Sequence, residues 1–277
     1  MKALPIGLAL SGGTAKAIAH VGVLQALSEG QLSIDFVAGT SGGSIVAVLK
    51  ALGMSIEEMQ GVAGSLSWTQ LASIKLTRLG IVSSRRIETL IHGFVGDKTF
   101  SDLSIPCAVT ATDLITGEKR VFRQGSIARA VRASCTIPQI FLPVEIDGRY
   151  YVDGGLSEYL PIETVQEWGE QFTIGVHVSR MPETIERPNH IIQLMMYVVQ
   201  LIARQNLSSS LTKADFVLAP DVGMYSAFDF GNAKDLMEAG YTTAKQEMSG
   251  LRRAVARKNR WLSQLKRRFS GWSRRHA

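Results

Sequence analysis

Residues 35–49, Asp-Phe-Val-Ala-Gly-Thr-Ser-Gly-Gly-Ser-Ile-Val-Ala-Val-Leu, decide the fold. The short apolar run Phe36–Ala38 predicts a buried strand, and Ser44–Leu52 has the pattern of a helix. Between them, glycines on both sides of Ser41 let the backbone turn sharply. A strand, a tight turn and a helix in this order form the repeating unit of α/β proteins.

The same alternation continues along the whole chain. The predicted strands are Pro5–Leu10, Phe36–Ala38, Cys107–Asp113, Lys119–Phe122, Tyr150–Val152, Phe172–Val178 and Phe216–Ala219. The predicted helices are Ile18–Glu29, Ser44–Leu52, Ile56–Leu66, Ser84–Val95, Ile127–Ser134, Ile162–Trp168, Ile191–Leu207 and Ala233–Arg257. Several strands are apolar throughout, which favours a central sheet covered by helices on both faces. We predict one α/β domain over residues 1–248 and a C-terminal extension over residues 249–277.

The composition suits a globular protein without metal or cofactor. Of 277 residues, 45% are hydrophobic and 19% are charged, a balance typical of a folded domain. Cys107 and Cys135 have no neighbouring Cys or His pattern of a zinc site, and two cysteines build no disulfide framework. We therefore expect a reducing, cytoplasmic compartment.

Three apolar segments bear on contact with membranes. The run before Ser11 resembles a short signal peptide, but it ends at once in a Ser-Gly-Gly turn and is better interpreted as a first strand. Ile191–Ala203 is shorter than the roughly 20 residues that cross a bilayer. Within it, Ile191–Ile202 is apolar nearly all round, which is typical of a buried core helix. Ser65–Ile81 mixes apolar and cationic residues and fits a lipid-facing segment and a buried one equally well.

Gly39-Thr40-Ser41-Gly42-Gly43 matches the G-x-S-x-G pattern of a nucleophile elbow. In such an elbow the serine sits in a strained turn between strand and helix, where its hydroxyl is accessible. The helix that follows adds N–H groups and a positive dipole end beside it. Taken alone, the motif fits a structural or phosphate-cradling turn as well as a nucleophile.

A second glycine turn, Ser11–Lys16, follows the first predicted strand. Its paired glycines are able to direct backbone N–H groups at one point, as an oxyanion requires. A phosphate loop would need G-x-x-x-x-G-K-[ST] and a dinucleotide turn G-x-G-x-x-G, and the sequence contains neither here.

A serine nucleophile needs a base, and the histidines are poorly placed for this role. An α/β-hydrolase carries its histidine after the last strand, where this chain has only His276. The other histidines fall in helical patterns, on a predicted strand or at a helix start: His20, His92, His177 and His190. Asp153, in Tyr151-Val152-Asp153-Gly154-Gly155, is a candidate base, although an acid before two glycines is most often a turn residue.

At this point the chain resembles the patatin-like phospholipases over residues 4–245. The resemblance rests on three blocks in order: Leu10–Leu24, Gly39–Ser44 and Arg132–Pro161. Ala111–Lys119 and Ala214–Val222 also read like segments of that family. The resemblance implies a three-layer fold and a Ser-Asp dyad without histidine, carried here by Ser41 and Asp153.

The resemblance also implies the activity and the rest of the site. The dyad would hydrolyse fatty-acyl esters of lipids or phospholipids through an acyl-enzyme. The oxyanion would be held by backbone N–H groups of Gly12, Gly13, Thr14 and Gly42. Supporting motif positions are Gly39, Gly43, Lys16, Gly154 and Gly155.

The sequence departs from the family pattern at several positions. Thr14 and Ala17 replace glycines, and Glu158 and Tyr159 stand where the family often has asparagine. A β-branched residue resists positive φ, and a lost oxyanion donor costs about 3 kcal/mol of transition-state stabilisation. Two alternatives therefore stay open beside a lipid hydrolase: a weakly active or inactive lipid-binding or regulatory protein, and a non-lipid esterase or thioesterase.

The C-terminal segment is strongly basic. After Glu247 there are ten basic residues and no acidic one, which leaves 20 basic against 24 acidic residues in the remainder. Within Leu251–Trp272, apolar residues recur at helical spacing, an interfacial pattern that favours peripheral binding of residues 250–277 to an anionic membrane. The alternative is a solvated terminal helix that packs on the domain, or simple disorder. Nucleic acid is disfavoured, because the aromatic residues lie with the apolar face.

Overall fold

A computed structural model describes residues 4–67, 71, 73–77, 80–169, 171–178 and 191–273. Its centre is an eight-stranded sheet in the order β10-β9-β1-β2-β5-β8-β7, with β6 paired to β5. The first five strands of this order run parallel, and the last two and β6 run antiparallel to their neighbours. The strands are β1 (Ile6–Leu10), β2 (Phe36–Thr40), β5 (Cys107–Asp113), β6 (Lys119–Phe122), β7 (Val144–Ile146), β8 (Arg149–Asp153), β9 (Phe172–Val176) and β10 (Phe216–Leu218).

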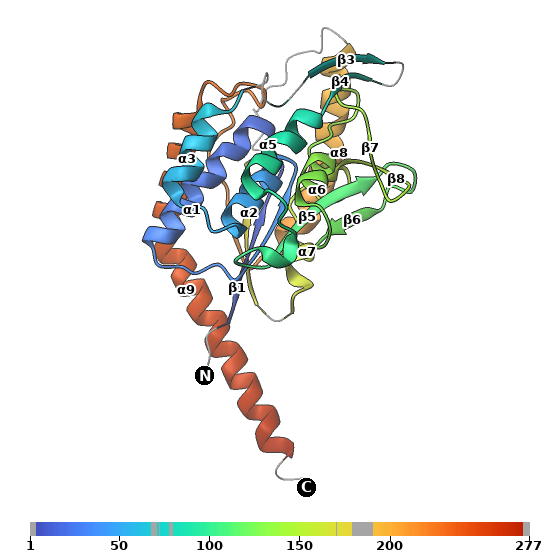
Figure 1. Cartoon of the computed structure of the whole chain (residues 1–277). Helices are drawn as coiled ribbons and strands as arrows, with labels where there is room; N and C mark the ends of the chain where they lie inside the picture. Colours follow the sequence, from blue (N-terminus) through green and yellow to red (C-terminus); the bar gives the residue numbers. More distant parts are fainter. Residues whose placement is uncertain are drawn as a thin grey trace.

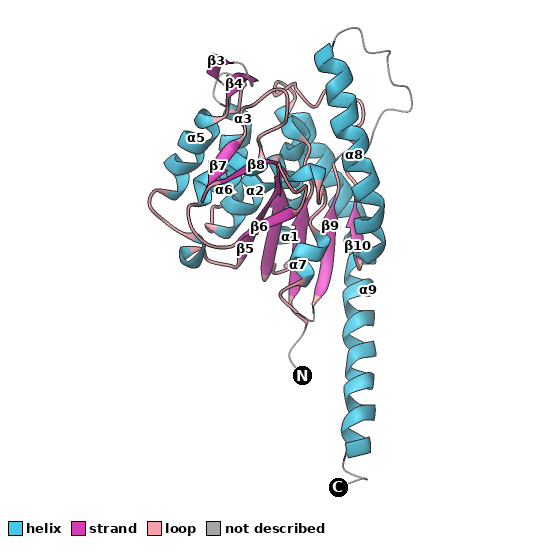
Figure 2. Ribbon diagram, turned by 90° about the vertical axis from the view of Figure 1, so that its right-hand side faces the viewer, coloured by secondary structure: helices cyan, strands magenta, loops and turns pink. Residues whose placement is uncertain are grey.

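Helices cover both faces of this sheet (Figures 1 and 2). They are α1 (Ala19–Glu29), α2 (Gly42–Ala51), α3 (Ile56–Ser65), α5 (Arg85–Val95), α6 (Ile127–Ser134), α7 (Ile162–Gln166), α8 (Ile191–Lys213) and α9 (Ala233–Ser273). Alternation along β1 shows the two layers, since Leu8 and Leu10 lie in the large core under α1 and α2 while Ala9 lies in the smaller core under α7 and α8. The predicted α/β architecture, a mostly parallel sheet between two helical layers, is confirmed.

The sequence predicted most elements to within a few residues and missed the least regular ones. Strand β7 and the hairpin of β3 (Ser73–Thr77) and β4 (Gly80–Ser83) were not predicted. The prediction that Ile191–Ile202 is a buried core helix is wrong for one side of α8, because Leu194, Val198 and Leu201 are 46–54% exposed. The opposite face of α8, with Ala203 and Leu207, packs on the domain.

Helix α9 is docked on the domain by two glycines. A Cβ on Gly22 of α1 would lie 1.8 Å from the carbonyl oxygen of Met237, and one on Gly240 of α9 would lie 2.0 Å from that of Ala19. The two backbones therefore cross at a distance that no larger side chain permits. Leu251 is fully buried in the large core, so the first part of the predicted lipid-facing stripe packs on the protein itself.

The end of α9 points away from the domain. Lys258 pairs with Asp215, next to the amino end of β10, and the Asn259 side chain accepts a hydrogen bond from Leu4, next to that of β1. From there the helix runs on to Ser273, away from the sheet (Figures 1 and 2). At 1.5 Å per residue this part is about 22 Å long. The helix is continuous across residues 248 and 249, so the division of the chain there stays a prediction.

The described part of the chain contains no helix with the length and apolar character needed to span a membrane.

Candidate active site

Ser41 lies in a strained turn between β2 and α2. Its backbone has φ 51° and ψ −129°, a conformation that a residue with a side chain rarely adopts. The flanking glycines are required by close approach, because a Cβ on Gly39 would lie 2.4 Å from the Gly43 carbonyl oxygen and one on Gly43 2.4 Å from that of Ser11. The Ser41 N–H donates to the hydroxyl of Ser134 at 2.8 Å, which ties the turn to the end of α6.

The strand register brings Asp153 level with Ser41. Thr40, the last residue of β2, lies opposite Thr110 of β5. The next residue of β5, Ala111, lies opposite Asp153, the last residue of β8. The two side chains thus meet from either side of β5, and the Ser41 Oγ donates a hydrogen bond of 2.6 Å to the Asp153 Oδ2.

The Asp153 carboxylate is held in a buried position. Its Oδ1 accepts a hydrogen bond from the Gly155 N–H at 2.8 Å, and the residue is only 6% exposed. Burial raises the pKa of Asp153 to about 6, and the hydrogen bonds from Ser41 and Gly155 oppose this rise. An aspartate with this pKa is a better base near neutral pH than an ordinary one.

The histidines described by the structure make no hydrogen bond to the Ser41 hydroxyl or to Asp153. The Nε2 of His20 lies 2.9 Å from the Ser11 carbonyl oxygen, and burial lowers its pKa to about 4. His177 follows β9 and stacks edge-on against Tyr159, and His92 is exposed on α5. His190 and His276 lie outside the described residues.

The glycine loop contributes fewer free donors than the sequence suggested. The Gly12 N–H already donates to the Tyr159 carbonyl oxygen at 3.1 Å, so counting it among the oxyanion donors was an overestimate. Among the described residues, no acceptor is bonded to the N–H groups of Gly13, Thr14 or Gly42. The last two lie together, since a Cβ on Gly42 would lie 3.3 Å from the Thr14 nitrogen.

Thr14 adopts the backbone conformation that a glycine would take. Its φ is 51°, in the left-handed region that β-branched residues avoid. The departure from the family pattern therefore adds a conformational cost to the loop.

Two pockets meet at Ser41. The first has an empty volume of about 700 Å³ and runs between α2 and α3. Thr14, Ser41 and Gly42 lie at its mouth. The rest of the lining is apolar except for the Cys135 thiol, and it includes Val46, Leu49, Met59, Val62, Ala63, Ile87 and Phe141. The second, of about 790 Å³, is lined from the glycine loop and α8 and contains Asp153, Lys16 and Arg204.

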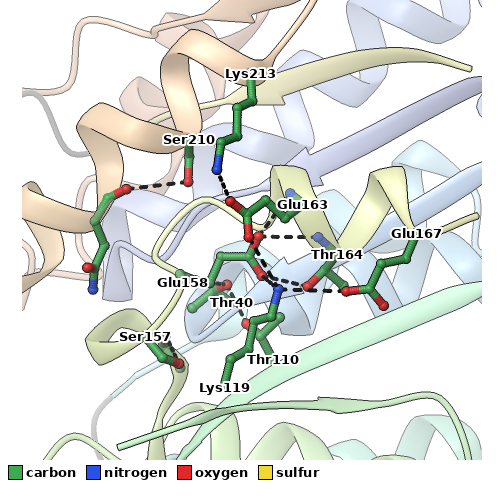
Figure 3. Close-up of polar contacts among 12 residues, drawn as sticks. Thr40, Thr110, Lys119, Ser157, Glu158, Glu163, Thr164, Glu167, Ser210 and Lys213 are labelled. Atoms are coloured by element: carbon green, nitrogen blue, oxygen red, sulfur yellow. Dashed lines mark hydrogen bonds and ion pairs between the residues drawn. The ribbon is translucent and has the colours of Figure 1, made fainter.

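A buried polar network under the elbow was not predicted from the sequence (Figure 3). The Thr40 hydroxyl lies 2.6 Å from that of Thr110 and donates to the Glu158 carbonyl oxygen at 2.8 Å. The Glu158 carboxylate accepts hydrogen bonds from the N–H groups of Glu163 and Thr164 at the start of α7 and pairs with Lys119 at 3.0 Å. Glu158 therefore caps a helix. The sequence signal for it is an acid four residues before the start of a helix, here Glu158 before Ile162.

The family model for patatin-like phospholipases matches residues 8–165. An uncharacterised NTE family protein of Mycobacterium tuberculosis is 33% identical over 177 residues, which is 63% of this chain and 49% of that protein. The human patatin-like phospholipase domain-containing protein 6 is 26% identical over 279 residues, covering 88% of this chain and 20% of that protein.

One solved structure supports the fold. The crystal structure of VipD from Legionella pneumophila superposes with a TM-score of 0.59 at 15% identity, covering 90% of this chain and 67% of that one. The chain spans about half the length of the mycobacterial relative and a fifth of the human one. Because the family model covers more than half of the chain, the protein belongs to the patatin-like phospholipase family.

Proposed function

We propose that this protein hydrolyses fatty-acyl esters of lipids, with Ser41 as the nucleophile and Asp153 as its base. The observation that carries the proposal is the 2.6 Å hydrogen bond from the Ser41 hydroxyl to the buried Asp153 carboxylate. Membership of the patatin-like phospholipase family supports lipid esters as the substrate class.

The reaction follows from this pair. The Ser41 Oγ attacks the ester carbonyl carbon while its proton moves to the Asp153 Oδ2. When the tetrahedral intermediate collapses, the bond to the alcohol breaks and that oxygen takes the proton from Asp153, leaving an acyl-serine. A water molecule then attacks the acyl carbon, gives a proton to Asp153 and releases the fatty acid, and the proton returns to Ser41.

The negative charge that develops on the carbonyl oxygen needs donors beside Ser41. The N–H groups of Gly13, Thr14 and Gly42, which have no acceptor among the described residues, are suited to this role, and Gly42 opens α2, whose dipole adds to their effect. We leave Gly12 out of this set because its N–H is bonded to Tyr159.

The apolar pocket is suited to the acyl chain. It opens at Ser41 and extends between α2 and α3 among aliphatic side chains. An acyl chain placed there brings its ester carbonyl to the hydroxyl and its leaving group toward the second pocket.

The end of α9 is the part suited to a membrane surface. The described side chains of this segment include an exposed Trp261 and an exposed Arg260, and its sequence is basic to the end. We propose that it binds anionic lipid at the cytoplasmic face of a membrane, with the region after Trp261 as the contacting part.

The test compares three variants with the wild type on short-chain nitrophenyl esters and on a fluorophosphonate that labels activated serines. Ser41→Ala should lose hydrolysis and labelling, and Asp153→Asn should lose most of both. Ser208→Ala, an exposed serine of α8, is the matched control and should behave as the wild type.

The outcomes separate the alternatives. Hydrolysis that persists in Ser41→Ala would refute the dyad. A wild type that neither hydrolyses nor reacts would favour an inactive lipid-binding protein. Hydrolysis of short esters or thioesters without any activity on long-chain lipids would favour a non-lipid esterase.

A further inference from the structure

Lys16 is a buried cation without a counter-charge. It follows the oxyanion loop, is 8% exposed and lines the second pocket at Ser41. No carboxylate or carbonyl oxygen of the described residues pairs with its ammonium group. The Lys16 Nζ also keeps some access to the pocket, because it is not one of the fully enclosed side-chain nitrogen and oxygen atoms that lack a hydrogen-bond partner. A buried charge normally has a partner, because removing it from water is costly.

Burial lowers the pKa of Lys16, and no acidic group among the described residues counteracts this effect. An anion bound in the pocket would restore it, since an opposite charge favours the protonated amine. The residue is thus poised for an anionic ligand and not for a structural ion pair.

Arg204 of α8 adds a second cation to the lining of this pocket. It projects from α8 into the same pocket and is exposed. Among the described residues it has no ion-pair partner, unlike Arg123, Arg132 and Arg149, which all pair with acids. The guanidinium group binds phosphate oxygens in a bidentate manner.

The described lining of the pocket offers no free carboxylate to a cation. Of the described residues that line it, Asp153 alone carries a carboxylate, and both of its oxygens are engaged, one by Ser41 and one by Gly155. The acyl pocket on the other side of Ser41 holds no charged side chain at all among its described residues. The charges therefore mark the side on which the leaving group lies.

We propose that Lys16 and Arg204 bind a phosphate group on the leaving-group side of the substrate, and that the enzyme prefers lipids with net-anionic headgroups to zwitterionic or neutral ones. This inference rests on the proposed ester hydrolysis and adds its headgroup specificity. A phosphomonoester or a glycerol phosphate fits the two cations, whereas the ammonium of a choline headgroup finds no free acid.

The experiment uses full-length protein and three monomeric lipids that share an oleoyl chain. These are monooleoylglycerol, its phosphate, and the corresponding phosphocholine, each below its micelle concentration so that surface charge plays no part. We expect wild type to show the highest kcat/KM on the phosphate. Arg204→Gln should lower the phosphate-to-monooleoylglycerol ratio of kcat/KM by about tenfold, as expected for a charge-assisted hydrogen bond. Arg253→Gln, an exposed and unpaired arginine of α9, is the matched control and should keep the wild-type ratio.

Further arms separate the sources of the phosphate and the two proposals. Inhibition of monooleoylglycerol hydrolysis by inorganic phosphate, without any preference for the phosphorylated lipid, would assign the site to a free anion and overturn the inference. Equal ratios in wild type and Arg204→Gln, or a preference for phosphocholine, would also overturn it while leaving ester hydrolysis intact. A wild type that cleaves none of the three lipids would refute the proposed function itself. Lys16→Met should lower the same ratio, and an unchanged ratio would exclude Lys16 from the site.

Discussion

The hydroxyl of Ser134 accepts a hydrogen bond of 2.8 Å from the backbone N–H of Ser41. Ser134 is fully buried at the end of α6, and the turn that it holds has φ 51° at Ser41. Ser134 is thus a positioning residue. Its hydroxyl fixes the strained backbone from which the Ser41 side chain projects, and no other acceptor among the described residues is bonded to that N–H.

We expect Ser134→Ala to lower kcat about tenfold with little change in KM, because a buried N–H left without an acceptor costs about 1–3 kcal/mol and frees the turn to relax. Steady-state kinetics and chemical denaturation measure both effects. Ser126→Ala removes the hydroxyl that caps the other end of α6 and should cost similar stability without lowering kcat. Equal losses of kcat in the two variants would show that stability alone is at work.

The pH dependence of the rate should follow Asp153. This carboxylate must be ionised to accept the proton of Ser41, and burial raises its pKa to about 6. We expect kcat/KM on a neutral ester to be constant above pH 7 and to fall tenfold per pH unit below about pH 6. The rate is measured by titration of the released acid. An inflection of the pH profile near the ordinary pKa of aspartate would contradict the assignment.

Thr14→Gly tests the departure in the oxyanion loop. Thr14 already holds φ 51°, so glycine should relieve backbone strain and raise the free energy of unfolding by about 0.5–1 kcal/mol. Gln31→Gly, at φ 53° in the turn before the amino end of β2, whereas Ser41 follows its carboxyl end, should give a similar gain. A tenfold rise in kcat for Thr14→Gly alone would show that threonine misdirects the donor.

The apolar pocket should set the acyl-chain length. Ala63 lies buried on the α3 side of the pocket, and Ala63→Phe should fill that end and lower kcat/KM for long-chain esters far more than for butyrate esters. Gly64→Ala is the matched control, because a Cβ there meets no atom within 4 Å. If Ala63→Phe lowers activity equally for all chain lengths, the acyl chain lies elsewhere.

The basic end of α9 should carry the binding to lipid. Removal of residues 262–277 deletes five basic residues, Lys266, Arg267, Arg268, Arg274 and Arg275, each worth about 1 kcal/mol near an anionic surface. Co-sedimentation with anionic vesicles should fall sharply for the truncated protein and, for the full chain, decrease with salt. Arg253→Gln should bind as the wild type does, and undiminished binding after truncation would move the contact to the domain.

The local patterns of the sequence predicted the elements and the three blocks around Ser41, Asp153 and the glycine loop. Strand β7 was missed because Glu145 interrupts its three residues, whereas the equally short β10 is a continuous apolar run and was predicted. The exposed face of α8 was missed because an apolar helical sequence does not reveal which of its sides has no other element packed against it.

Long-range pairings explain what the sequence left open in the site. The Gly12 N–H bonds to a residue 147 positions away, Tyr159, and the Ser41 N–H to one 93 positions away, Ser134. Arg204 lines the pocket at Ser41 from more than 160 positions away. None of these contacts has a spacing rule. The positive φ of Thr14 likewise depends on the loop being fixed by its surroundings, against the local preference of threonine.

The direction of α9 determines which lipids such a protein would reach. Ser41 follows the carboxyl end of β2, whereas α9 leaves the domain past the amino ends of the parallel strands β1 and β10 and extends about 22 Å further. A bilayer bound by the last turns of α9 would lie on the side of the amino ends of the strands, opposite the side on which Ser41 lies. Tethered in this way, the enzyme would work in trans, on lipid arriving from the opposite direction as single molecules or on a second apposed surface, and its own anchoring membrane would be spared.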